Sequence, residues 1–279
     1  MSFQPLVPMG GLAGWRFLER TAEAQRASFE RSLALARDTA YFEANIGRID
    51  SAEALVKDRR LLGVALGAFG LEAEIDKRFF IRKVLEGGSE GPGALARRLS
   101  APGFRQLAEA FGFGNEGGAQ TARAGFAERI VEQYRVRQFE AAVGNVDDNM
   151  RLALNFRREV KEIAEAATGS GSGWFQLLGS RPLRAVVEKA FGLPKEFGRI
   201  DVDRQRDMLR DRTRSLFGDG SVAAFRDPAN VERLITRFLA RAQIEGVAGA
   251  GVTSPALQLL QGMNDGGSAG LLNLLAARR

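Results

Sequence analysis

The sequence predicts an all-α protein, and three observations lead to that prediction. Ala, Leu, Arg, Glu and Gln, which favour helices, dominate most segments. Apolar residues recur at three- and four-residue spacing, whereas no strand-length stretch alternates apolar and polar residues. The 33 glycines cluster rather than scatter, as expected of the breaks between helices. The 279 residues leave one large domain or two smaller ones open.

The first half of the chain contains five predicted helices after an N-terminal segment that Pro and Gly interrupt. The helix from residue 50 is predicted because Asp50 to Glu53 resembles a capping box, and Gly70 is a suitable stop. Ser100 and Pro102 suit the start of the last one. The predicted helices cover residues 15–46, 50–70, 72–86, 92–99 and 102–111.

The second half begins with a loop at 112–120, followed by a long helical stretch over 121–166. Gly144 and Asn145 mark a bend or a break in it. The sequence TGSGSG at 168–173 has the composition of a flexible hinge, and helical periodicity resumes after it.

The tetrapeptide AFGL occurs twice, at 68–71 and at 190–193, and this raises the question of an internal duplication. At the same offset of 122 residues, Leu61 aligns with Leu183. The same order recurs around both copies: an aromatic pair, an apolar helix, AFGL, an amphipathic helix, a short helix, a proline and a helix ending in L-x-x-x-F. The aromatic pairs are Tyr41-Phe42 and Trp174-Phe175. This order predicts two pseudo-repeated helical lobes joined by a long helical connector.

The predicted organisation has five parts. The terminal parts are the least regular, and the two lobes flank the connector. The parts are an N-terminal segment and helix (1–40), lobe 1 (41–117), a connecting helix (118–168), lobe 2 (169–246) and a C-terminal interaction segment (247–279).

Composition excludes several classes of site. The chain has no Cys and no His, so disulfides, Cys/His zinc sites and His-dependent catalytic triads are ruled out. Any metal site needs oxygen ligands. No catalytic, cofactor-binding or metal-binding residues are predicted, and the chain is expected not to be an enzyme.

Two motifs have simpler structural interpretations. The sequence from Gly112 to Gly117 fits G-x-G-x-x-G, but it follows a predicted helix rather than a strand, so it is read as a loop. The acidic pairs Asp147-Asp148 and Asp201-x-Asp203 offer carboxylates for Mg²⁺ or acid–base chemistry. Asp201, like Asp227, is more simply a helix cap.

Charge supports an alternative function. The net charge is +6, which suits a basic helical module that binds nucleic acid in regulation. However, the positive residues are interleaved with acidic ones, as is typical of solvated helix faces. No small-molecule substrate is expected.

The two ends of the chain carry the tentative partner-binding residues. The N-terminal helix contributes Trp15, Phe17 and Leu18. The sequence LLNLLAARR near the C-terminus is apolar with a basic end, and it either packs on the protein's own core or meets a partner. Its candidate residues are Leu271, Leu272, Leu274 and Leu275. Neither a signal peptide nor a membrane-inserted helix is expected.

Several phrases, in order, resemble a bacterial family catalogued as a domain of unknown function. They are ARDTAYFEANIGRIDSAEALVKDRRLLGVALGAFGLEAEIDKRFFIRKVLEGG, LARRLSAPGFRQLAEAFGF, NMRLALNFRRE and SRPLRAVVEKAFGLPKEFGRIDVDRQ. The resemblance covers about residues 28–245. Members are often encoded in flagellar gene clusters, so the resemblance implies a non-enzymatic structural or assembly protein with flagellar protein partners. It also implies a place in the cytoplasm, the basal body or an exported axial structure.

Overall fold

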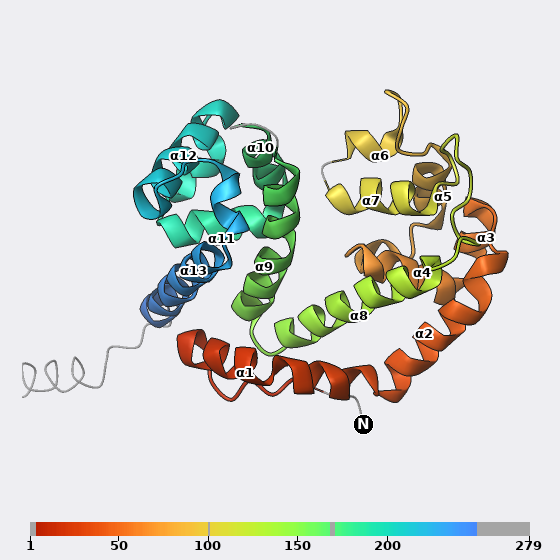
Figure 1. The fold of residues 1–279 in the computed structure, drawn as a ribbon, viewed down its shortest axis with the longest axis horizontal. Coiled ribbons are helices and arrows are strands. Elements are labelled where there is room, and N and C mark those ends of the chain that lie inside the picture. Colours follow the sequence, from red (N-terminus) through yellow and green to blue (C-terminus); the bar gives the residue numbers. More distant parts are fainter. Residues whose placement is uncertain (1–3, 100, 168–170, 250–279) are drawn as a thin grey trace, which may run out of the picture.

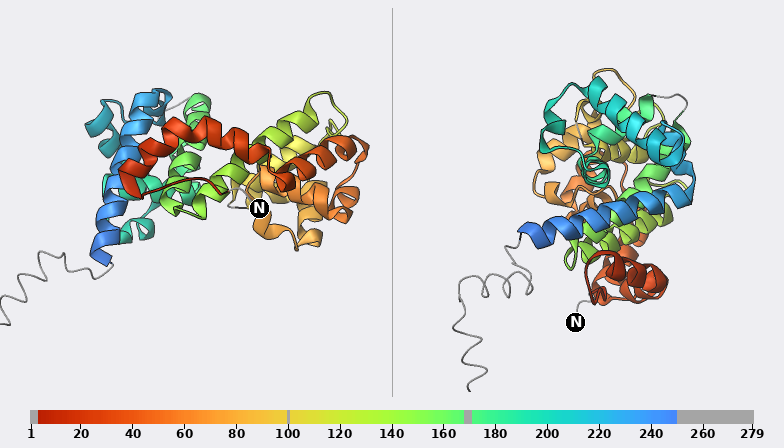
Figure 2. Two further views of the ribbon diagram at one scale, coloured as in Figure 1. Left: turned by 90° about the horizontal axis from the view of Figure 1, so that it is seen from below. Right: turned by 90° about the vertical axis from the view of Figure 1, so that its left-hand side faces the viewer.

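The computed structural model describes residues 4–99, 101–167 and 171–249. These residues form α-helices and short 3₁₀ helices without any strand, which confirms the all-α prediction. Figure 1 shows two groups of helices, one on each side, that are joined through α8 and α9. The N-terminal helices α1 and α2 run along the side of the molecule on which α8 and α9 meet (Figure 2).

The N-terminal arm consists of two helices, α1 (Gly11–Glu30) and α2 (Leu33–Asn45). The prediction of one helix over 15–46 was therefore wrong. The backbone of Ser32 is extended, with φ −62° and ψ 137°, and a new helix begins after it. Serine favours such starts, although this side chain makes no capping hydrogen bond.

Lobe 1 begins with two short helices where the sequence predicts one. Ser51 Oγ accepts a hydrogen bond from the Ala54 amide at 3.3 Å, and the Asp58 carboxylate accepts from the amides of Arg60 and Leu61 at 2.9 and 3.1 Å. The Asp58 cap marks the end of the first short helix and the start of the second. The elements of the lobe are η1 (Ile46–Arg48), α3 (Ala52–Lys57), α4 (Arg59–Ala68), η2 (Glu72–Glu74), α5 (Arg78–Glu86), α6 (Leu95–Arg98) and α7 (Pro102–Phe111).

The predicted connector is a corner of two helices, α8 (Phe126–Gly144) and α9 (Asp148–Ala166). The break falls at the predicted position after Gly144. The Asp147 side chain caps α9 by accepting from the Asn149 and Met150 amides at 2.9 and 3.3 Å. The chain changes direction here, so α8 extends toward lobe 1 while α9 runs up the side of lobe 2 (Figure 1).

Lobe 2 follows the residues at 168–170 that lie outside the described ranges. Asp201 accepts hydrogen bonds from the Asp203 and Arg204 amides, and Asp227 accepts one from the Ala229 amide. Both predicted caps are thereby confirmed. The elements are α10 (Ser172–Gly179), α11 (Arg181–Phe191), η3 (Lys195–Arg199), α12 (Val202–Phe217), η4 (Val222–Arg226) and α13 (Pro228–Gly249).

Each lobe has its own hydrophobic core. The core of lobe 1 extends from Phe42 in α2 to Val131 in α8. The core of lobe 2 combines α9 to α13 with Phe139 of α8 and with Trp15 and Leu18 of α1. Helix α8 therefore contributes to both cores, and α1 packs with lobe 2 although lobe 1 follows it in the sequence.

The two AFGL tetrapeptides perform the same local task. Gly70 and Gly192 both adopt a left-handed conformation, with φ of +69° and +64°. The following residue in each copy donates its amide to a carbonyl five residues back, at 2.9 Å in both cases. This is the Schellman ending of a helix, which favours glycine followed by an apolar residue.

The order of elements around the two endings supports the predicted duplication without proving it. Helices α3, α4, α5 and α7 with η2 and α6 between them have counterparts in α10, α11, α12 and α13 with η3 and η4. The aromatic pairs do not fit this order. Tyr41-Phe42 lies in α2, two helices before its AFGL ending, whereas Trp174-Phe175 lies in α10, immediately before α11. The duplication therefore stays a prediction that rests on the other elements.

The Gly192→Ala variant is expected to lose about 1–2 kcal/mol of unfolding free energy, because a Cβ disfavours the left-handed conformation. Gly179→Ala is the matched control, since no atom lies within 4 Å of its added Cβ and its φ is not positive. It should unfold at the same or a slightly higher urea concentration. Urea titrations followed by circular dichroism compare the two, and equal midpoints would contradict the assigned helix ending.

Candidate functional site: the cleft between the lobes

The structure does not place the predicted N-terminal residues on an exposed surface. Trp15 and Leu18 are 2% and 1% exposed and pack in the core of lobe 2, while Phe17 is half-buried. The amphipathic helix α1 therefore buries its apolar face against lobe 2 of the same chain. The predicted C-terminal residues Leu271, Leu272, Leu274 and Leu275 lie outside the described residues.

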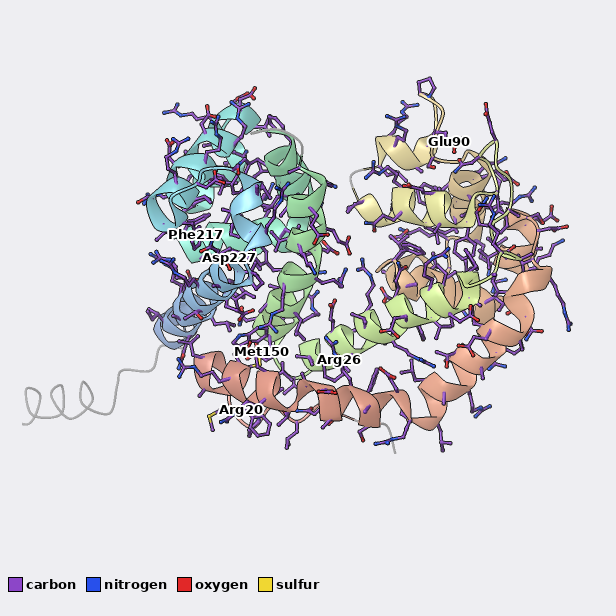
Figure 3. All side chains as sticks on the ribbon, viewed as in Figure 1. Arg20, Arg26, Glu90, Met150, Phe217 and Asp227 are labelled. Carbon is purple, nitrogen blue, oxygen red and sulfur yellow. The ribbon has the colours of Figure 1, made fainter. Side chains whose placement is uncertain are left out.

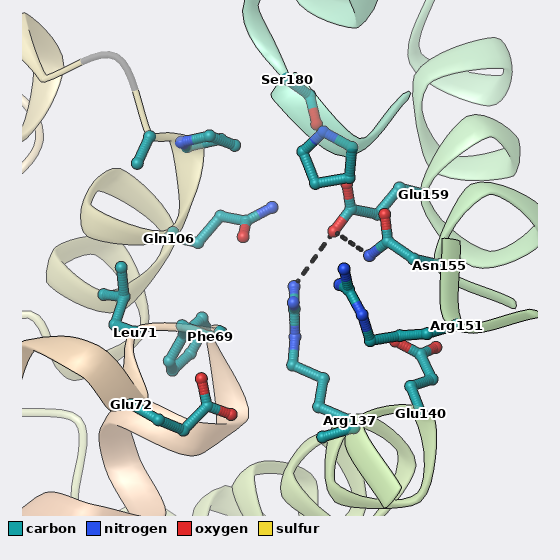
Figure 4. Close-up of a pocket in the computed structure, with 16 residues that line it drawn as sticks. Phe69, Leu71, Glu72, Gln106, Arg137, Glu140, Arg151, Asn155, Glu159 and Ser180 are labelled. Atoms are coloured by element: carbon teal, nitrogen blue, oxygen red, sulfur yellow. Dashed lines mark hydrogen bonds and ion pairs between the residues drawn. The ribbon is translucent and has the colours of Figure 1, made fainter. Parts of the chain in front are cut away.

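A cleft between the lobes brings charged and apolar side chains together. It consists of two adjoining hollows of about 260 and 400 Å³, which share Phe69, Gln106 and Arg137 in their walls. Lobe 1 contributes the end of α4 and the exposed side of α7, lobe 2 contributes α9 and the start of α11, and α8 connects them. Figure 4 shows these side chains facing one another from both sides.

Ion pairs between α8 and α9 form the polar part of the cleft. The Arg158 guanidinium donates from Nε and Nη2 to the two oxygens of Glu140, both at 2.9 Å. Arg137 donates to Glu159 Oε1 at 3.3 Å, and Asn155 donates to the same oxygen at 3.1 Å. Only 7% of the Glu140 side chain is exposed. Such bidentate, partly desolvated pairs are stronger than surface pairs and fix the orientation of both helices.

Burial and neighbouring charges shift the pKa values of this network. Burial and the nearby Arg158 charge lower the pKa of Arg137. Burial acts in the same direction on Arg158, but its hydrogen bonds to Glu140 and the surrounding carboxylates outweigh burial and raise the Arg158 pKa. Desolvation raises the pKa of Glu72, on the lobe 1 wall, above its ordinary value. Both guanidinium groups stay charged near neutral pH, so the cleft keeps fixed charges.

The starts of two helices also line the cleft. Helix α7 begins at Pro102 and α11 at Arg181, and neither has a side-chain cap. Ser180, which precedes α11, is 5% exposed and lines the cleft. Apolar walls come from Phe69 and Leu71. Pro102 and Pro182 have no backbone N–H, so these two helix starts present fewer free amide donors than other helix starts.

Two kinds of feature are absent from the described residues. Within the described ranges, no group of three or more acidic side chains is arranged to hold a metal ion. Nor does any described helix combine the length and apolarity needed to cross a membrane.

Sequence reasoning missed the ion-pair network, although a signal for it was present. Glu140 lies four residues after Val136 and three before Val143, on the apolar side of its helix. Arg158 stands four residues after the buried Leu154. Charged residues that interrupt two apolar stripes indicate a buried pair, but only the fold shows that the stripes face each other.

The chain resembles a protein of known structure. A crystal structure of a structural-genomics target from Agrobacterium tumefaciens matches 87% of this chain and 99% of its own chain, with 24% identity and a TM-score of 0.70. At this identity the likeness shows a shared fold. No curated protein matches the chain significantly.

A family model matches residues 68–231, which is more than half of the chain. This segment contains every residue that lines the cleft, from Ala68 to Pro182. Helices α1, α2 and α3 lie outside it. The chain therefore belongs to the family described as proteins of unknown function, DUF1217.

Proposed function

We propose that the chain is a non-enzymatic structural or assembly protein of the bacterial flagellum that acts through protein–protein contacts. The flagellar part rests on the sequence resemblance described above. The proposed binding of a partner rests on the cleft, where two lobes with separate cores face each other across charged and apolar walls. We assign to this cleft the binding of a polypeptide segment from a flagellar partner.

The charges of the cleft favour a polypeptide over a highly charged polymer. In the first hollow three glutamates (Glu72, Glu140 and Glu159) outnumber two arginines (Arg137 and Arg151), and in the second hollow three glutamates balance three arginines. Nucleic acid needs a basic surface whose counterions are released on binding. A segment with both amide and carbonyl groups can pair with both kinds of side chain.

The first test is photo-crosslinking in living cells. Gln106→p-benzoylphenylalanine places the probe in a residue that lines both hollows. Arg105→p-benzoylphenylalanine is the matched control, because Arg105 is exposed and belongs to neither hollow. A flagellar protein should be crosslinked to residue 106 at least fivefold more than to residue 105.

The cellular test compares cytosol, purified hook–basal bodies and culture supernatant in cells with and without a working export gate. Deletion of the gene should reduce motility, and the protein should occur with flagellar structures or depend on the gate. Normal motility after deletion would overturn the flagellar assignment. Salt-sensitive binding to generic DNA, without a protein crosslink at residue 106, would favour the nucleic-acid alternative instead.

A further inference from the structure

The cleft is locally acidic in a protein whose net charge is +6. Side chains of both lobes project into the space between them (Figure 3). Among the described residues, six glutamates line the two hollows, against four arginines. The charge of the cleft is therefore opposite in sign to that of the whole chain. Such a local field favours a partner whose charge complements it.

The carboxylates without a partner are concentrated in the hollow of about 400 Å³. It is lined by Glu109 of α7, Glu132 of α8 and Glu162 of α9, and all three residues are exposed. None of them forms an ion pair with another residue of the described ranges. Three helices thus contribute one accessible carboxylate each to the same hollow.

The arginines of this hollow do not neutralise these carboxylates. Arg137 pairs with Glu159, and Arg158 pairs with Glu140. Arg129, the third arginine in the lining, has no ion pair with another described residue. In the described part of the hollow, three unpaired carboxylates therefore outnumber one unpaired guanidinium.

A second observation, in the adjoining hollow, indicates a hydrogen-bond donor on the partner. Asn155 is 7% exposed, and its side chain extends from α9 into the cleft beside Glu159 (Figure 4). Its Nδ2 donates to Glu159, but its Oδ1 accepts no hydrogen bond from any described residue. A buried acceptor without a donor costs free energy, so binding of an N–H group at this atom would be favourable.

We infer that the polypeptide segment bound in the cleft is basic. Its Lys or Arg side chains pair with the three unpaired glutamates, and one of its N–H groups donates to Asn155 Oδ1. This inference rests on the proposed function, because it names the chemistry of the segment assigned to the cleft. The charged ends of Lys and Arg have only donors, which suit carboxylate acceptors. Their aliphatic stems can pack on the apolar wall at Phe69.

An array of random peptides of about nine residues, probed with the labelled full chain, tests the inference. Lys and Arg should be at least threefold enriched among the bound peptides, although the net charge of +6 by itself favours acidic ones. Glu132→Gln with Glu162→Gln should lower this enrichment at least twofold. Glu128→Gln with Glu165→Gln is the matched control and should keep the enrichment, because it removes two charges from the same helices at exposed positions outside both hollows.

The outcomes of the array separate this inference from the proposed function. Bound peptides without a preference for Lys and Arg would overturn the inference and leave the cleft as a polypeptide site. A preference for acidic peptides, or the same enrichment in both double variants, would also overturn it and assign the binding to another part of the surface. Binding of no peptide at all would overturn both the inference and the proposed binding of a polypeptide.

Asn155→Leu tests the hydrogen bond separately, because leucine has a similar volume and no acceptor. In isothermal titration calorimetry, the tightest-binding array peptide should bind this variant at least fivefold more weakly than the unaltered chain. The preference for Lys and Arg on the array should persist. Circular dichroism verifies that the variant is folded. Unchanged affinity would overturn the role of Asn155.

Discussion

Replacing Trp174 with alanine is expected to lower the free energy of unfolding by about 4 kcal/mol. Trp174 is fully buried in the core of lobe 2, and its indole N–H donates to the Gly220 carbonyl at 3.0 Å. Its ring also contacts Phe225, which in turn contacts Phe156, with ring centroids 6.2 and 5.9 Å apart. The substitution removes the packing, creates a cavity and leaves a buried carbonyl without its donor.

The neighbouring residue provides a matched control for this variant. Phe175 is 39% exposed, and its ring lies near the Arg206 guanidinium on the surface. Phe175→Ala should cost less than about 1 kcal/mol. Urea titrations monitored by circular dichroism measure both. Similar losses for the two variants would contradict the assignment of Trp174 to the core and Phe175 to the surface.

This difference between neighbours shows what the sequence could predict and what it could not. The aromatic pair was visible in the sequence, but which ring is buried depends on contacts with distant residues, such as Gly220 and Phe225 around Trp174. Features set by a few adjacent residues were accessible: the caps at Asp201 and Asp227, and the break after Gly144. Each depends on hydrogen bonds between residues close together in the chain, whose chemistry is readable from residue type.

Features set by distant residues were not accessible in this way. Trp15 and Leu18 form an apolar face, but their sequence does not state whether that face meets a partner or the chain itself. The structure buries them against lobe 2. The cleft has the same origin, because Phe69 and Ser180 come together only through the corner between α8 and α9. Periodicity indicates that a face is buried, whereas the fold determines its neighbour.

The Glu140→Ala variant is the second change with a large expected effect, a loss of about 3 kcal/mol in unfolding free energy. It removes the carboxylate that accepts the two 2.9 Å hydrogen bonds of the largely buried Arg158, whose guanidinium keeps the longer bond from Nη1 to Glu159 Oε1 at 3.4 Å. Glu86→Ala is the control, since its pair with Arg82 is more exposed and joins residues four apart on one helix. That loss should be below about 1 kcal/mol.

A double variant separates the cost of leaving Arg158 poorly paired from the contribution of the Glu140–Arg158 pair itself. In Glu140→Met with Arg158→Met, apolar side chains of similar length replace both charges, so most of the lost stability should return. If the double variant is as unstable as Glu140→Ala, the pair itself stabilises the corner between α8 and α9. If stability returns but the crosslink from residue 106 is lost, the pair is required to shape the cleft for its partner. Stability and partner binding would then depend on the same two side chains for different physical reasons.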